Sequence, residues 1–179
     1  SGRFGYSVSM QTVASGFSLT YSIMPCRSRP AAGESPAVAQ EILSPAEFFG
    51  HEAGERFTDF GQVRSYAEAL ASASDQVELR QYGVTPEGRP MLLLVLSRSG
   101  TLNQVERSLE SLARLTEPDL PVDDASEIAR REKAVVWFTY GIHGDESSST
   151  EAALWTAWDL AAGTNGSPGI LDSLIVVID

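Results

Sequence analysis

The stretch Ala134-Val-Val-Trp-Phe-Thr-Tyr-Gly-Ile-His-Gly-Asp-Glu-Ser147 decides the fold class of this chain. Its first nine residues, Ala134–Ile142, are almost all apolar, β-branched or aromatic, which is the composition of a β-strand. The following segment, Ser147–Ala162, carries alanine, leucine and tryptophan at helical spacing and predicts a helix with one buried side. A strand that leads directly into a helix is typical of an α/β domain.

The segments on both sides continue this alternation of strands and helices. Val77–Gly83 alternates apolar and polar residues, Met91–Leu96 is apolar throughout, and a turn at Thr85–Gly88 joins them as a hairpin. A last apolar strand is predicted over Leu174–Ile178. The sequence therefore predicts an α/β fold with a mixed, largely parallel sheet flanked by helices. Further helices are predicted from Ser44, over Gln62–Ser74, and along the apolar positions Val105, Leu109, Leu112 and Leu115.

The chain between the helix predicted along Val105 to Leu115 and the strand Ala134–Ile142 is less regular. Pro118 and Pro121 end the helix, and an acidic segment follows at Asp123–Glu127. Ile128–Glu132 is compatible with one or two further helical turns.

Composition limits the partners of the protein. Thirteen basic and 24 acidic residues give a net charge of −11, which argues against nucleic acid and anionic membranes, because both bind basic surfaces. No run of 18 apolar residues occurs, so no integral membrane segment is expected. The single cysteine, Cys26, excludes an internal disulfide and a cysteine-rich metal site. No pattern indicates the oligomeric state.

Residues 1–43 differ from the rest and are predicted to be an irregular leader. Serine, glycine, proline and arginine are frequent there, and Val13–Met24 is mildly apolar. The leader is interpreted either as disordered or as a degraded signal segment. A signal segment predicts a secreted or periplasmic protein, and a disordered leader is compatible with a cytoplasmic one. Residues 44–179 are predicted to form one domain, which we expect to be incomplete because its last segment is a strand of the buried type.

The candidate site lies where the deciding strand gives way to the helix. Ligands of open α/β sheets bind beyond the carboxyl ends of strands, and His143 and Glu146 lie at such an end. Gly141 and Gly144 allow the backbone to turn tightly around the imidazole. A histidine and a glutamate three residues apart can converge on one Zn²⁺, which takes nitrogen and carboxylate ligands. Asp145 could then orient a ligand or face solvent.

The same residues have an interpretation without metal. A strand-end histidine can cap the helix, and the helix dipole favours a glutamate in the first turn. A histidine and a glutamate at this spacing also occur together by chance in many chains. The residue pair alone therefore leaves both interpretations open.

Other chemically distinctive residues are interpreted as structural. His51 lies far upstream and is expected to be a surface or structural histidine, not a third ligand. Arg89 follows a turn and is expected to be a surface charge or an ion-pair partner. Trp137, Trp155 and Trp158 are interpreted as core or packing residues, not as a substrate cage.

Several segments, in order, resemble the zinc carboxypeptidase family. The hairpin Gln81–Met91, with its Gly-Val-Thr-Pro-Glu-Gly-Arg-Pro, resembles the family's hairpin before a buried strand. Gly141–Glu146 resembles its Gly-x-His-Gly-x-Glu zinc motif. Ser44–Gly50 resembles the opening of a bacterial branch, and Leu174–Asp179 resembles the strand before the family's Asn-Pro-Asp-Gly segment. Ordered motifs are more specific than any one of them.

The resemblance implies a zinc-dependent metallocarboxypeptidase that hydrolyses the C-terminal bond of a peptide or protein, with His143 and Glu146 as zinc ligands. It implies that residues 44–179 are the N-terminal part of the catalytic domain. The family's third ligand, general-base glutamate and carboxylate-binding arginines would follow residue 179, so the chain alone is expected to be inactive. The alternatives are a zinc-dependent deacylase of N-acyl amino acids and a non-catalytic remnant that serves as a binding module.

Overall fold

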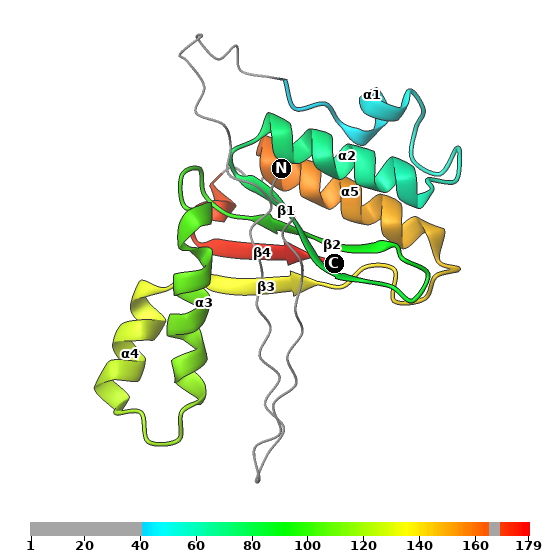
Figure 1. Cartoon of the computed structure of the whole chain (residues 1–179). Helices are drawn as coiled ribbons and strands as arrows, with labels where there is room; N and C mark the ends of the chain where they lie inside the picture. Colours follow the sequence, from blue (N-terminus) through cyan, green and yellow to red (C-terminus); the bar gives the residue numbers. More distant parts are fainter. Residues whose placement is uncertain (1–40, 165–168) are drawn as a thin grey trace, which may run out of the picture.

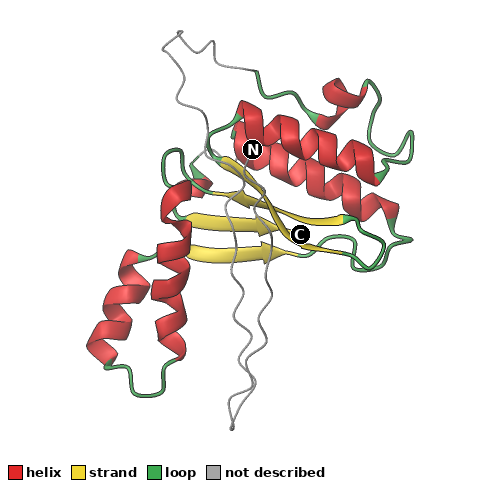
Figure 2. Cartoon of the chain, viewed as in Figure 1, coloured by secondary structure: helices red, strands yellow, loops and turns green. Residues whose placement is uncertain are grey.

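A computed structural model describes residues 41–164 and 169–179, which form a mixed β-sheet with two long helices on one face (Figure 1). These helices, α2 and α5, lie side by side, and α3 and α4 form a helical hairpin at one end of the sheet (Figure 2). The helices are α1 (Pro45–Phe49), α2 (Phe60–Ala73), α3 (Val105–Ala113), α4 (Val122–Arg131) and α5 (Ser147–Ala162), with 3₁₀ turns at Leu102–Gln104, Arg114–Thr116 and Ile170–Asp172.

The sheet has the strand order β1-β2-β4-β3. The strands are β1 (Val77–Val84), β2 (Pro90–Leu96), β3 (Ala134–Phe138) and β4 (Leu174–Ile178). β1 and β2 form the predicted antiparallel hairpin, β2 pairs antiparallel with β4, and β3 pairs parallel with β4. The predicted α/β class with a mixed sheet is confirmed. The sheet is not largely parallel, however, because parallel pairing among the described strands is confined to β3 and β4.

The main core lies between the sheet and helices α2 and α5. Side chains alternate across a strand, so Leu94 and Leu96 of β2 point to this core while Val95 points to the opposite face. On that opposite face, Val95 packs with Ile175 of β4 and Val105 at the start of α3. Buried members of the main core are Tyr66, Ala67, Leu70, Val77, Leu94, Leu96, Leu154, Ala157, Ala161, Leu171, Val176 and Ile178.

A buried arginine ties the helical hairpin to the sheet. Arg80 of β1 contacts Glu78 at 2.7 Å and also forms an ion pair with Glu106 of α3. Burial opposes the charge of the Arg80 guanidinium, but the two glutamates outweigh this effect and raise its pKa. The ion pair with Glu106 therefore holds α3 against β1, and Val105 at the start of α3 packs in the small cluster on the same side.

The ends of the helices follow local capping signals. Ser44 and Glu47 form a reciprocal capping box at α1, as the predicted helix start indicated. α2 begins two residues before the predicted Gln62, because Asp59 caps it and pairs with Gln62 in a second capping box.

The segment after Pro121 is more regular than predicted. α4 is one continuous helix, Val122–Arg131, where we predicted an acidic segment followed by one or two helical turns. Two aspartates occupy its first turn and two arginines its last turn, which suits the helix dipole at both ends. The acidic residues therefore begin the helix instead of preceding it.

Strand β3 ends at Phe138, earlier than the predicted Ile142. Its last paired residue lies opposite Ile178, the last residue of β4. Beyond that pair, the Tyr140 N–H donates to the Asp179 carbonyl at 3.0 Å, and Gly141 then adopts a φ of +66°. This left-handed conformation, which glycine adopts easily, turns the chain out of the sheet.

The prediction that Trp137 is a core residue is wrong. β3 is an edge strand of the described sheet, and Trp137 is 57% exposed on it. The other two tryptophans have the predicted packing role. Trp155 and Trp158 form an edge-to-face pair with ring centroids 5.4 Å apart, and the Trp158 Nε1–H donates to the Ile42 carbonyl.

Tyr66 makes the stability of the fold sensitive to alkaline pH. Its side chain is buried, and its hydroxyl donates to the Leu43 carbonyl at 2.9 Å. Burial, followed by the negative charge of Glu47, raises the pKa of Tyr66 well above its ordinary value. The group stays protonated in the folded chain at a pH where it ionises in the unfolded chain. Its contribution is therefore complete below the unfolded pKa of about 10 and is lost as the pH rises further.

We therefore expect the free energy of unfolding to fall from about pH 10 upward, by at most about 1.4 kcal/mol per pH unit for this group. Urea denaturation at pH 8, 9, 10 and 11 measures the slope. The control is Tyr66→Phe, which keeps the ring and removes the ionisable hydroxyl. Its slope between pH 10 and 11 should be smaller than that of the wild type. Equal slopes would show that Tyr66 does not cause the alkaline sensitivity.

Two predicted features lie outside the described residues. They are Cys26 with almost all of the predicted leader, residues 1–40, and part of the predicted loop at 165–168. Among the described helices, none has the length and apolar composition needed to cross a membrane.

Candidate metal centre

The loop between β3 and α5 forms the candidate site at the carboxyl end of β3. Two backbone bonds join the start of this loop to the end of the neighbouring strand: Asp179 N–H to the Phe138 carbonyl, and Tyr140 N–H to the Asp179 carbonyl, both 3.0 Å. The Tyr140 hydroxyl also lies 2.9 Å from Thr156 Oγ1 of α5. The loop therefore starts from a position that is fixed by both the sheet and the helix.

His143 and Glu146, the two predicted ligands, lie together in this loop. Nδ1 of His143 is 3.2 Å from Oε1 of Glu146, and the Glu146 N–H donates to the His143 carbonyl at 3.1 Å. Their side chains are 70% and 59% exposed, so both are accessible from solvent. Glu146 is the N-cap residue of α5, and its side chain does not cap the helix.

The separation of these atoms fits two ligands of one zinc ion. Two atoms bound to tetrahedral zinc at about 2.0–2.2 Å lie about 3.3–3.6 Å apart. The observed 3.2 Å between His143 Nδ1 and Glu146 Oε1 is close to that range. An imidazole nitrogen and a carboxylate are also the donor types that zinc accepts. The pair can therefore hold an ion after a shift of a few tenths of an ångström.

Asp145 faces solvent between the two predicted ligands. It is exposed and has no hydrogen-bonding or ion-pair partner among residues 41–164 and 169–179. Of its two expected roles, the solvent-facing one matches the structure.

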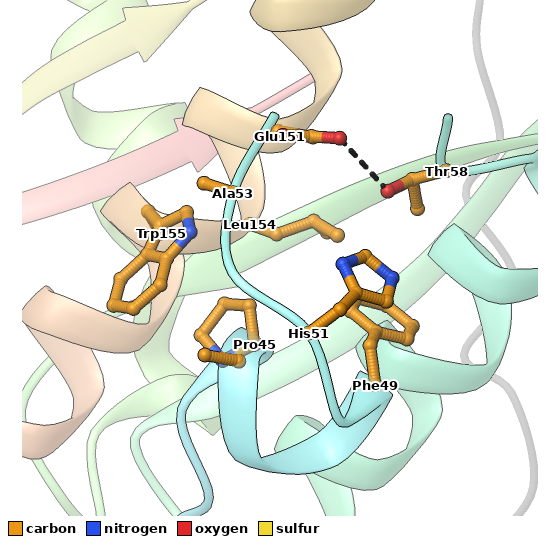
Figure 3. A pocket seen from close by; sticks show the side chains of 9 residues that line it. Pro45, Phe49, His51, Ala53, Thr58, Glu151, Leu154 and Trp155 are labelled. Atoms are coloured by element: carbon orange, nitrogen blue, oxygen red, sulfur yellow. Dashed lines mark hydrogen bonds between the residues drawn. The ribbon is translucent and has the colours of Figure 1, made fainter. Parts of the chain in front are cut away.

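His51 lies in a different environment and does not join the pair. Its Nδ1 is 3.0 Å from the Glu52 carbonyl, and the ring stacks on Phe49. Figure 3 shows it in a small pocket beside Thr58 and Glu151, which bond to each other at 3.2 Å. Within the described ranges, no three histidine, cysteine, aspartate or glutamate side chains converge as a metal site. The stacked ring is compatible with a structural histidine, and the assignment of His51 as structural stays a prediction.

Arg89 is exposed on the β1–β2 turn, as predicted for a surface charge. Its backbone N–H donates to Thr85 Oγ1, and its side chain forms no ion pair with any residue in the described ranges.

The structure adds polar contacts near the site that sequence reasoning missed. The Gly141 N–H donates to Ser149 Oγ at 2.8 Å, and the Tyr82 hydroxyl donates to Asp179 Oδ1 at 2.9 Å. Burial and then the Asp179 carboxylate raise the pKa of Tyr82. The run of serines at the start of α5 was the available signal for Ser149, but serine there is also common for helix capping.

The chain matches a known protein family. The family described as zinc carboxypeptidase matches residues 63–174, which is more than half of the 179 residues and includes both His143 and Glu146. No curated protein matches the chain.

Proposed function

Because this chain belongs to the zinc carboxypeptidase family, we propose that it contributes His143 and Glu146 to the zinc site of an enzyme that removes C-terminal residues from peptides. The observation that carries this proposal is the 3.2 Å approach of His143 Nδ1 to Glu146 Oε1 at the carboxyl end of β3. Family membership supports zinc as the ion and a peptide as the substrate class.

The described residues contribute binding and orientation to this reaction. His143 and Glu146 would hold the ion, and the loop and helix that carry them would fix its position at the edge of the sheet. When bound, zinc supplies a Lewis acid that polarises the scissile carbonyl and acidifies a water molecule. Exposure of both side chains leaves room for a peptide to approach.

The remaining parts of the site would come from outside the described residues. Catalytic zinc is held by three protein ligands and keeps one position open. The described residues bring two ligands together and contain no group of three. We therefore propose that the third ligand and the general base lie elsewhere, and that residues 1–179 alone hold zinc weakly and hydrolyse peptides very slowly.

The test is to isolate the protein as its own cells make it, supply zinc, and incubate it with a peptide whose C-terminus is free. We expect mass spectrometry to show stepwise loss of C-terminal residues, because the family acts on that end of the chain. The matched control is the same peptide with an amidated C-terminus, which should stay intact. A second control is the His143→Ala variant, which should release roughly 100-fold less product, because each zinc ligand contributes about 2.5–4 kcal/mol to binding.

Other results would contradict the proposal. Hydrolysis of an N-acyl amino acid without trimming of the peptide would identify a deacylase. Absence of any zinc-dependent hydrolysis, with zinc still bound through His143, would identify a binding module.

A further inference from the structure

Ser149 makes hydrogen bonds on both sides of the candidate metal loop. Its Oγ accepts the Gly141 N–H at 2.8 Å, and its own N–H donates to the Glu146 carbonyl at 3.1 Å. Gly141 lies two residues before His143, and Glu146 is the other expected ligand. One residue of α5 therefore connects the backbone segments that carry the two ligands.

The position of His143 depends strongly on this backbone. Its side chain is 70% exposed, and Glu146 is its only side-chain hydrogen-bond or ion-pair partner among the described residues. The intervening Ile142 is 75% exposed and gives no packing support. Gly141 is thus the last residue before His143 that is bonded to the helix, and the bond is made to Ser149.

The backbone conformation of Gly141 determines where the chain runs next to this hydrogen bond. Its φ of +66° lies in the left-handed region, where the chain leaves the sheet and turns toward the helix. The turn aims the Gly141 N–H at the Ser149 hydroxyl. Without an acceptor at that place, neighbouring backbone angles would be free to vary, and the His143 ring would move with them.

We infer that Ser149 is a positioning residue for the metal site, and that its hydroxyl sets the approach of His143 to Glu146. This inference rests on the proposed function, because it takes the pair to be zinc ligands. Groups that orient metal ligands typically change metal affinity 10- to 100-fold when they are removed. Gly141 is exposed, so water can partly replace the lost acceptor. The lower part of that range, about 10-fold, is therefore the expected effect.

The experiment measures binding of Zn²⁺ and of Co²⁺ alone to the purified chain, by competition with a chromophoric chelator. Ser149→Ala should bind both ions about 10-fold more weakly than the wild type. Its Co²⁺ absorption bands should also broaden, because the ligand geometry is less fixed. Ser149→Thr keeps the hydroxyl and should bind within about 2-fold of the wild type.

The matched control is Ser148→Ala, the same change one residue earlier on the exposed start of α5. It should leave the affinity unchanged. Thermal unfolding of the metal-free variants separates positioning from a general loss of structure. We expect Ser149→Ala and Ser148→Ala to melt within about 2 °C of each other, because both sites are at the helix end and partly or fully exposed.

The outcomes distinguish this inference from the proposed function. If His143→Ala weakens binding but Ser149→Ala binds as tightly as the wild type, Ser149 does not position the ligands and the inference is overturned while the metal site stands. If Ser149→Thr binds as weakly as Ser149→Ala, the hydroxyl is not the cause and the inference is also overturned. If the wild type shows no His143-dependent binding, the proposed function is contradicted, and the inference that rests on it is overturned with it.

Discussion

Replacing His143 by alanine is expected to weaken Zn²⁺ binding roughly 100-fold. Four-ligand zinc sites bind with about 10–16 kcal/mol, which is about 2.5–4 kcal/mol for each ligand. Since about 1.4 kcal/mol corresponds to a factor of ten, loss of one ligand lowers the affinity roughly 60- to 700-fold. The side chain is 70% exposed, and Glu146 is its only side-chain hydrogen-bond or ion-pair partner among the described residues, so its removal should leave the fold intact.

Isothermal titration with Zn²⁺ on the wild type and the variant measures the difference. Glu146→Gln should weaken binding to a comparable degree, because it removes the charged oxygen that faces His143 Nδ1. The matched control is Asp145→Asn, which removes the same negative charge from the same loop but not from a ligand. It should change the affinity less than 3-fold, as expected for a screened surface charge. Equal losses in all three variants would indicate nonspecific attraction of the cation to an acidic loop.

Replacing Leu96 by alanine is expected to lower the free energy of unfolding by about 3–5 kcal/mol. Leu96 lies on β2, between β1 and β4, and its side chain has 0% exposure. It belongs to the core between the sheet and helices α2 and α5, together with eleven other buried residues among those described. In a closely packed core, the surrounding side chains can move little into the vacated volume. The loss of unfolding free energy is therefore expected at the upper end of the range for Leu→Ala substitutions.

A loss of that size is a large fraction of the 5–15 kcal/mol typical of a folded domain. Urea denaturation followed by circular dichroism measures it, with Leu115→Ala as the matched control. Leu115 lies in the 3₁₀ turn after α3 and is exposed, so the same truncation should cost less than about 1 kcal/mol there. If Leu96→Ala lowered the free energy of unfolding as little as Leu115→Ala, the core between the sheet and helices α2 and α5 would not be the main source of stability.

The sequence predicted most reliably the elements whose boundaries depend on local signals. Helix α5 and strand β4 have the predicted limits, because a serine run, a left-handed Gly163 and a continuous apolar strand mark them within the chain itself. The end of β3 was missed because the left-handed Gly141 turns the chain out of the sheet, whereas Thr139 and Tyr140 are good strand formers by composition. Trp137 was misjudged because its exposure follows from the place of β3 in the sheet order.

In the candidate site too, features set by local sequence could be predicted and features set by distant contacts could not. His143 and Glu146 could be paired from their spacing, which a short loop before a helix enforces, and their assignment as zinc ligands stays a prediction. The contact of Gly141 with Ser149 could not be predicted, because it depends on the φ of one glycine and the direction of one hydroxyl. The bond between Tyr82 and Asp179 joins residues 97 positions apart, which no local pattern records.

The strand order also determines when the metal loop can form during synthesis. β4 follows β3 in the chain, yet it lies between β2 and β3 in the sheet. β3 has no partner in the described sheet until β4 arrives, and the backbone bonds of Phe138 and Tyr140 are made to Asp179. The β1–β2 hairpin can form early because its contacts are local, whereas pairing across a long separation is slow. On the ribosome, the segment around His143 is therefore expected to stay unstructured until residues 174–179 have emerged.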